Sequence, residues 1–298
     1  MTSPIAPTHG KYGALYVLRP NGFSGVGLND AEWNSGYNGA ASAYFEVVID
    51  WAGSIDTFKW RVNGGAWTED VEITGALQTL SDNQKIIFTA TTGHTLGDQW
   101  VIGNLKDEAT TESTNEAQIT SAARRLLNPN ASIVFTDSGG KTVTRISHTN
   151  GKAVFSGNVA NVTVTGNNGY IPALALKKVG YLIGWSLNTS LEMSDASCMG
   201  QNWKEALPGQ AGGTGSANAY FIATQTLWNN LKDTIAASGE KFFLLQLFNY
   251  DPDQDQTGDH INAWVTFNTF GLNGEPGSVV KEQVNFQVQG EVSFVSNA

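Results

Sequence analysis

Residues 182–221 read LIGWSLNTSLEMSDASCMGQNWKEALPGQAGGTGSANAYF, and their pattern is the most informative in the chain. The first part of this stretch places an apolar or β-branched side chain at every second position, at Ile183, Trp185, Leu187 and Thr189. This alternation is typical of a strand with one buried face. A polar segment with a single tryptophan follows, and then a strand of small residues. We expect a loop over residues 193–215, and a loop of this length usually contacts another surface.

The composition indicates a turn-rich β protein. The chain has 298 residues, enough to bury a sizeable core, and only 15% of them are charged, against about 25% in an average globular protein. Glycine, asparagine, threonine and serine take the place of the missing charges. A single cysteine, Cys198, excludes an intrachain disulfide. The first residues show no signal-peptide pattern and the longest apolar runs are too short to span a bilayer, so we expect folding in a reducing cytosol and no membrane partner.

The net charge of −10 argues against nonspecific DNA binding, because such binding needs an excess of lysine and arginine to neutralise phosphates. An acidic wall, in contrast, would let nucleic acid pass without sticking. The charge is uneven along the chain. Residues 23–104 contain three basic and ten acidic residues, a charge of −7, which favours a separate module.

Short strands are predicted through this module, at residues 44–50, 57–62, 85–90 and 99–103, after a first strand at 11–18. Asn63, Gly64 and Gly65 predict a tight hairpin turn. The spacing of about ten residues is typical of a small sandwich. Residues 105–120 are polar, acidic and free of aromatic side chains, and they are interpreted as a linker or mobile loop.

The rest of the chain predicts more strands and one helix. Four short β segments lie between residues 132 and 166, and later strands are expected at 242–249, 261–270 and 278–295. Leu227, Leu231 and Ile235 recur every four residues, which predicts a helix over 224–237. In the last strand the apolar positions 284, 286 and 288 alternate with uncharged amides. A neutral amide face suggests contact with another subunit or a lumen.

The best metal candidate is the acidic segment with Asp251, Asp253, Asp255 and Asp259. Alternate carboxylates can direct several oxygens at one hard cation. However, a calcium loop requires glycine at the sixth position and glutamate at the twelfth, where Gln256 and Asn262 stand. The segment is therefore interpreted as a solvated acidic turn, and no metal is expected.

No catalytic residue and no cofactor are expected. The four histidines lack ligand spacing, and His94 is expected to order a turn by hydrogen bonding. The glycine-rich segment 209–215 lacks the lysine and the helix of a phosphate loop. Ser194 and Ser216 lie in no nucleophile-elbow sequence, and Cys198 is expected at a buried or contact surface.

The order of elements resembles the tail tube proteins, or major tail proteins, of long, flexible-tailed bacteriophages (siphophages). The resemblance rests on the segment GWSLNTSLEMSDASCMGQNWKEALPG, the small-residue strand after it, the helix at 224–237, the closing strand QVNFQVQGEVSFV and the N-terminal THGKYGALYVLRP. It covers residues 1–22 and 105–298 as the tail tube domain. Residues 23–104 resemble small β modules of other phage structural proteins, inserted here and expected on the exterior.

The resemblance implies a mainly β fold: a β-sandwich that forms a barrel between subunits, with one flanking helix. Homohexameric rings would stack into the tube through which phage DNA passes without specific binding, with other tail proteins as further partners. The virion tail would be assembled in the host cytoplasm. The contact loop between subunits and rings would contain Met193, Asp195, Trp203, Lys204, Glu205 and Leu207. The acidic turn with Asp251, Asp253, Asp255 and Asp259 is a candidate for facing the lumen.

Three alternatives stay open. A monomeric carbohydrate-binding or adhesin-like protein would explain the nine tryptophans. A hydrolase with carboxylates such as Glu192 and Asp195 would need a pocket in which they converge. The inner tube of a contractile tail or of a secretion machine shares the architecture of the favoured hypothesis.

Overall fold

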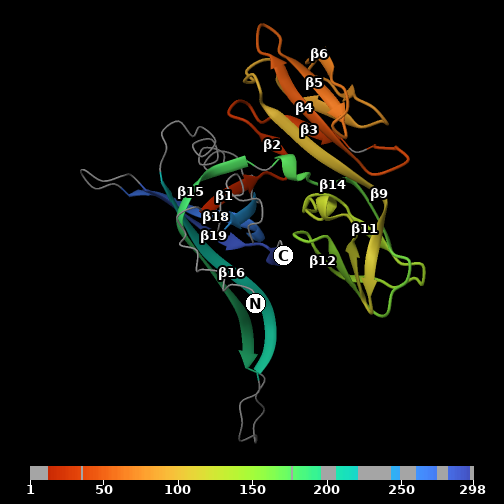
Figure 1. Cartoon of the computed structure of the whole chain (residues 1–298), viewed down its shortest axis with the longest axis vertical. Helices are drawn as coiled ribbons and strands as arrows, with labels where there is room; N and C mark the ends of the chain where they lie inside the picture. The colour runs from red at the N-terminus through yellow and green to blue at the C-terminus, as the bar shows by residue number, and fades with distance from the viewer. Residues whose placement is uncertain are drawn as a thin grey trace, which may run out of the picture. The chain divides into compact units, whose positions relative to one another are not determined.

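The computed structural model describes residues 13–34, 36–175, 177–195, 206–220, 243–248, 260–273 and 281–295. These residues form a mainly β protein, as predicted (Figure 1). The helix predicted at 224–237 lies outside the described residues. The chain divides into two compact units, and the described part of the first consists of residues 13–16 and the strands that follow residue 178. Residues 17–178 build the second unit.

The first unit is built on one seven-stranded sheet. Its strands are β1 (Gly13–Leu18), β15 (Lys177–Asp195), β16 (Ala206–Tyr220), β17 (Phe243–Phe248), β18 (His260–Asn273), β19 (Lys281–Val288) and β20 (Ser293–Val295). The strand order is β17-β1-β15-β16-β19-β18-β20, and β17 also pairs with β18. This additional pairing closes the sheet on itself. All six residues of β17, FLLQLF, are buried, as expected for a short strand paired along both sides and covered on both faces.

The second unit contains a larger and a smaller sheet. Its strands are β2 (Phe23–Ser24), β3 (Ala31–Asn34), β4 (Ala43–Trp51), β5 (Thr57–Val62), β6 (Thr68–Glu72), β7 (Gln78–Thr79), β8 (Lys85–Phe88), β9 (Gln99–Ser113), β10 (Glu116–Ile119), β11 (Val134–Thr136), β12 (Val143–Ser147), β13 (Lys152–Phe155) and β14 (Thr163–Tyr170). Short 3-10 turns lie at Ala122–Arg124 and Ala173–Ala175. Strands β3, β8 and β7 form the smaller sheet.

Two hydrophobic cores lie within this second unit. One is built from residues between Phe23 and Trp100, and the other from residues between Leu105 and Tyr170. The predicted boundary at 104/105 falls between these cores. Residues 105–178, however, group with residues 17–104 and not with the closed sheet. This grouping differs from the expected division, in which residues 105–178 belonged with the C-terminal strands.

Strand β9 explains the difference and corrects the linker prediction. Residues 105–120 are strand over most of their length, because β9 continues to Ser113 and β10 follows at Glu116. The first part of β9 pairs with β4, and the later part pairs with β14 and β10. A polar, acidic composition suggested a loop, but β9 pairs with β14 over residues 105–109 and with β10 over residues 110–113, and β10 also pairs with β13. One continuous strand therefore joins the two cores.

The hairpin turn predicted at residues 63–65 is confirmed. Asn63 and Gly64 both have positive φ, at 49° and 70°, and the Gly65 amide donates to the Val62 carbonyl at 2.9 Å. Two consecutive positive φ angles are the geometry of a type I′ turn, which matches the twist of the flanking strands β5 and β6.

Candidate functional site

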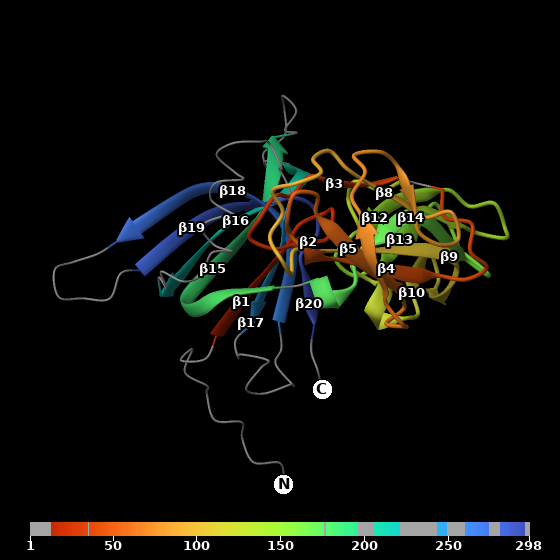
Figure 2. The same ribbon diagram turned by 90° about the horizontal axis from the view of Figure 1, so that it is seen from above.

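Two neighbouring rows of side chains on one face of the closed sheet are polar and uncharged across four adjacent strands. The register joins Ser186 to Ser216, Ser216 to Asn285 and Asn285 to Thr269. A second row joins Asn188, Thr214, Gln287 and Thr266 in the same order. We call these eight residues the neutral face. Figure 2 shows the four strands β15, β16, β19 and β18 side by side.

Cross-strand hydrogen bonds order this neutral face. The Ser186 and Ser216 hydroxyls lie 3.0 Å apart, and the Asn285 amide donates to the Thr269 hydroxyl at 2.7 Å. Between these positions, the β19 side chains of Val284, Phe286 and Val288 point the other way and are buried. The alternation predicted for the last strand is confirmed, with a hydrophobic face inside and an amide face outside.

The small residues of β16 make room for the buried side chains of β19. A Cβ added at Gly215 would lie 2.4 Å from Phe286 Cζ and 2.5 Å from the Ser186 carbonyl oxygen. At Gly213 the nearest atom would be Val288 Cγ2, at 3.0 Å. The glycines at these positions therefore allow the large side chains of β19 to fill the interior beneath β16.

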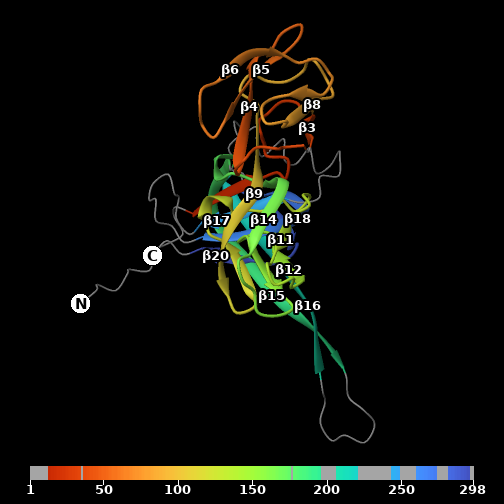
Figure 3. The same cartoon turned by 90° about the vertical axis from the view of Figure 1, so that its right-hand side faces the viewer.

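The β15–β16 hairpin extends beyond the rest of the sheet. Strand β16 pairs with β15 from Ala206 to Ala219, but β19 covers β16 only from Thr214 to Tyr220. Strand β15 has nineteen residues, and its other neighbour, β1, has six. We call residues 188–195 and 206–213 the arm (Figure 3). Among the described residues, no strand pairs with the outer edge of 206–213.

A further open edge lies on β18. Strand β17 pairs with β18 from His260 to Val265, whereas β19 pairs with β18 as far as Asn273. Residues 266–273 of β18 therefore have no strand on their second side within the described part of the chain. The arm and this edge of β18 both offer unpaired main-chain groups, which are templates for pairing with another chain.

The structure corrects the loop predicted at 193–215. Residues 193–195 and 206–215 lie in β15 and β16, where Met193 pairs with Pro208, Ser194 with Leu207 and Asp195 with Ala206. Glycine and proline suggested a loop, but a two-stranded ladder tolerates both where one edge is open. Met193, Asp195 and Leu207 therefore lie close together along the main chain of the arm, and their side chains lie outside the description.

The other predicted contact residues, Trp203, Lys204 and Glu205, lie outside the described residues, as does Cys198. The same holds for the acidic turn with Asp251, Asp253, Asp255 and Asp259. Sequence reasoning missed the part of the neutral face that lies on β15, β16 and β18. The signal was present as polar residues at every second position, Thr214, Ser216 and Asn218, within a segment interpreted as part loop.

A buried ionic cluster surrounds His94 in the second unit. Its Nδ1 lies 2.9 Å from Asp56 Oδ2 and its Nε2 lies 2.8 Å from Asp30 Oδ1. Burial alone lowers the pKa of His94, but the hydrogen bonds to Asp30 and Asp56 outweigh it, so the pKa is raised above its ordinary value. Despite burial, bonds to His94 and to main-chain amides lower the pKa of both carboxylates. His94 therefore orders the segments that contain residues 30, 56 and 94 by hydrogen bonding, as predicted.

Within the described ranges, no group of three or more histidine, cysteine or acidic residues is arranged to hold a metal ion. Nor does that part of the chain include a helix long and apolar enough to cross a membrane.

No protein-family model matches the sequence, and no curated protein matches it. Among solved structures, the chain is similar to a chain of the tail of an empty gene transfer agent particle with C6 symmetry. The identity is 16% and the TM-score 0.32, over 41% of this chain and 87% of the other. A chain of the native gene transfer agent virion matches with 17% identity and a TM-score of 0.32, over 41% of this chain and 91% of the other. A TM-score of 0.32 is too low to establish a shared fold, so neither chain bears on the function of this one.

Proposed function

We propose that this protein is the tail tube subunit of a siphophage, and that it assembles into stacked hexameric rings. The observation that carries the proposal is the arm, which extends open strand edges beyond the closed part of the sheet. Its outer strand, residues 206–213, carries no charged residue that would protect an edge, and a single proline at position 208. In the proposal, the arm and the open edge of β18 pair with neighbouring copies.

The neutral face lines the bore in this proposal. Phosphate contacts by lysine or arginine would hold DNA and make its release depend on salt. Hydroxyl and amide groups remain hydrated and carry no net charge, so they neither attract nor repel the phosphate backbone. Such a surface fits DNA that passes through the tube without specific binding.

The proposal places the protein in the virion tail, assembled in the host cytoplasm with other tail proteins as partners. It involves no cofactor and no catalytic step. The second unit, including the module at residues 23–104, takes the exterior of the tube. In the proposal, Trp203, Lys204 and Glu205 form contacts with adjacent subunits and rings.

Replacement of Trp203, which lies in the sequence between the two segments of the arm, tests this function. We expect Trp203→Ala to leave the subunit folded and to prevent assembly, because an aromatic centre usually contributes most of the stability of an interface. Sedimentation velocity of the purified protein measures the assembly, and circular dichroism checks the fold. Trp67→Ala, in the second unit, is the matched control and should assemble like the wild type. Tubes of normal length from Trp203→Ala would contradict the role of the arm.

A further inference from the structure

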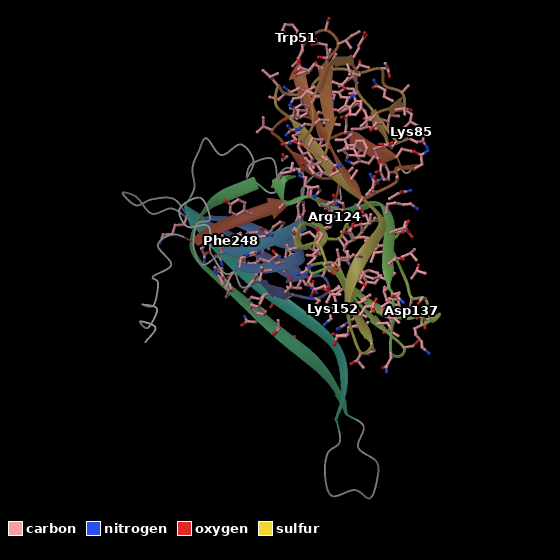
Figure 4. All side chains as sticks on the ribbon, turned by 45° about the vertical axis from the view of Figure 1, so that its right-hand side comes forward. Trp51, Lys85, Arg124, Asp137, Lys152 and Phe248 are labelled. Carbon is pink, nitrogen blue, oxygen red and sulfur yellow. The ribbon has the colours of Figure 1, made fainter. Side chains whose placement is uncertain are left out.

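Four loops of the second unit meet at one end of its first core. They comprise residues 25–30, 51–56, 73–77 and 89–98. The strand registers place them together, because Ala31 pairs with Phe88 and Trp51 with Thr57. Figure 4 shows Trp51 at one extremity of this unit and Asp137 toward the other. We call these loops the apolar tip.

Large hydrophobic side chains are exposed at the apolar tip. Leu96 is 66% exposed and Trp51 is 62% exposed. Of the nine large hydrophobic side chains that are exposed among the described residues, six lie in these loops: Val26, Leu28, Trp51, Ile55, Leu77 and Leu96. Such a concentration indicates a binding surface, whereas single exposed apolar residues do not.

The apolar tip presents no exposed charge, although the core beneath it belongs to a segment of charge −7. The only titratable residues in the four loops are Asp30, Asp56, Asp98 and His94. Asp56 and Asp98 are each 1% exposed, the His94 ring is fully buried, and Asp30 bonds to that ring. The remaining exposed residues of the loops are glycine, alanine, serine, threonine or apolar.

The buried carboxylates bind the main chain of the loops from inside. Asp98 accepts hydrogen bonds from the amides of Val26, Gly27 and Thr95, at 2.9, 3.1 and 2.7 Å. Asp56 accepts from the amides of Gly53 and His94, and Asp30 accepts from that of Ala90. These amides do not depend on water for a partner, so removing water from this surface costs less than at an ordinary loop.

From this combination we infer that the apolar tip docks into the interfacial region of an electrically neutral lipid bilayer. Aliphatic side chains with one tryptophan are the residue types that enter this region. A sugar ligand would use the amide donors that the carboxylates already occupy. The apolar groups stand on four separate loops, and lipid adapts to such a contour more readily than a protein face does. The inference replaces the expectation of no membrane partner, which was argued from the absence of a spanning segment and not from the exposed surface. It does not depend on the proposed tube role.

The charges determine which bilayer the apolar tip enters. The tip contains no lysine or arginine to attract anionic headgroups, and the segment behind it is acidic. Vesicles of phosphatidylcholine should therefore bind the protein better than vesicles rich in anionic lipid. The difference should be greatest at low ionic strength, where charges are least screened.

Vesicle flotation of the full chain tests the inference, since protein assemblies without lipid do not float. The wild type is expected to float with phosphatidylcholine vesicles, and Leu96→Asp to reduce the bound fraction at least tenfold, because it places a charge in the interface. Val134→Asp is the matched control. Val134 is 53% exposed and lies in β11 of the other core, so this variant should float like the wild type.

Three results would overturn the inference: no flotation of the wild type at millimolar lipid, equal loss in both variants, or preference for anionic vesicles. Self-association of the wild type that Leu96→Asp abolishes, without lipid binding, would also overturn it and assign the apolar tip to a second copy of the chain. Circular dichroism of both variants confirms that each is folded before its flotation is compared.

Discussion

Gly215 lies where a side chain has no room. A Cβ at this position would meet both the buried Phe286 ring and the main chain of Ser186. We expect Gly215→Val to destabilise the protein by about 1–3 kcal/mol, because overfilling a packed interior forces neighbouring atoms to shift. Chemical denaturation measures the change. Gly184→Val is the control, since a Cβ at Gly184 would have no atom within 4 Å. Equal stability of the two variants would contradict the close approach of β16 and β19.

His94 predicts a dependence of stability on pH. Its pKa is raised in the folded protein, so its contribution is fully present below about pH 6.5 and is lost as the pH rises through the folded value. The pKa values of Asp30 and Asp56 are lowered. Their contribution is present above about pH 4 and is lost as the pH falls through the folded values. The cluster therefore stabilises most between about pH 4 and about pH 6.5.

Comparison with His94→Gln checks this expectation, because glutamine does not titrate. The free energy of unfolding of the wild type should exceed that of His94→Gln by more at pH 5 than at pH 9. A difference that stays constant over this range would show that the pKa of His94 is the same in the folded and the unfolded protein, and a smaller difference at pH 5 would show that His94 is neutral when folded.

At the scale of elements, the sequence predicts strand positions well where side chains alternate. The amide face of β19 and the turn at Asn63 and Gly64 follow directly from local rules, since each depends on neighbouring residues. The pairing of strands that are far apart in the sequence does not follow from local rules. The polar residues after position 104 are strand because β9 finds partners in β10 and β14. Likewise, the glycines of β16 lie in a strand because β16 pairs with β15 and β19, and the side chains of Phe286 and Val288 fill the space that a Cβ of Gly215 or Gly213 would occupy.

The sequence predicts one outreaching loop over residues 193–215, whereas the structure pairs residue 193 with 208 and residue 194 with 207 in the strands of the arm. The role of these residues in subunit contacts stays a prediction. The hydroxyl rows of the neutral face depend on cross-strand register, which a single sequence does not specify. Ser216 and Asn285 become neighbours only when β16 and β19 align.

The open edge of the arm gives a prediction at this scale. Gly212 is exposed, and a Cβ there would come no closer than 4.0 Å to Ser190 Oγ. We expect Gly212→Lys to fold normally and to reduce assembly, because lysine on an open edge blocks pairing with another strand. Sedimentation velocity compares it with Thr144→Lys, an exposed position on β12. Equal assembly of both variants would exclude the edge from subunit contacts.

For the whole molecule, the proposed function predicts how assembled tubes retain or release DNA. If the neutral face lines the bore, the double variant Asn285→Lys with Gln287→Lys places a ring of positive charge in the path of DNA. Assembled tubes of this variant should retain DNA that the wild type releases, and the retention should weaken steeply with salt. Filter retention of labelled DNA over a salt series measures it. Retention that is the same in variant and wild type would place the neutral face elsewhere.

In the proposed function, copies of this chain join through the open edges of the closed sheet. Negative-stain electron microscopy of the concentrated, purified protein tests this assembly. We expect hexameric rings stacked into tubes with a central channel. Single, well-folded particles at every concentration examined would contradict it.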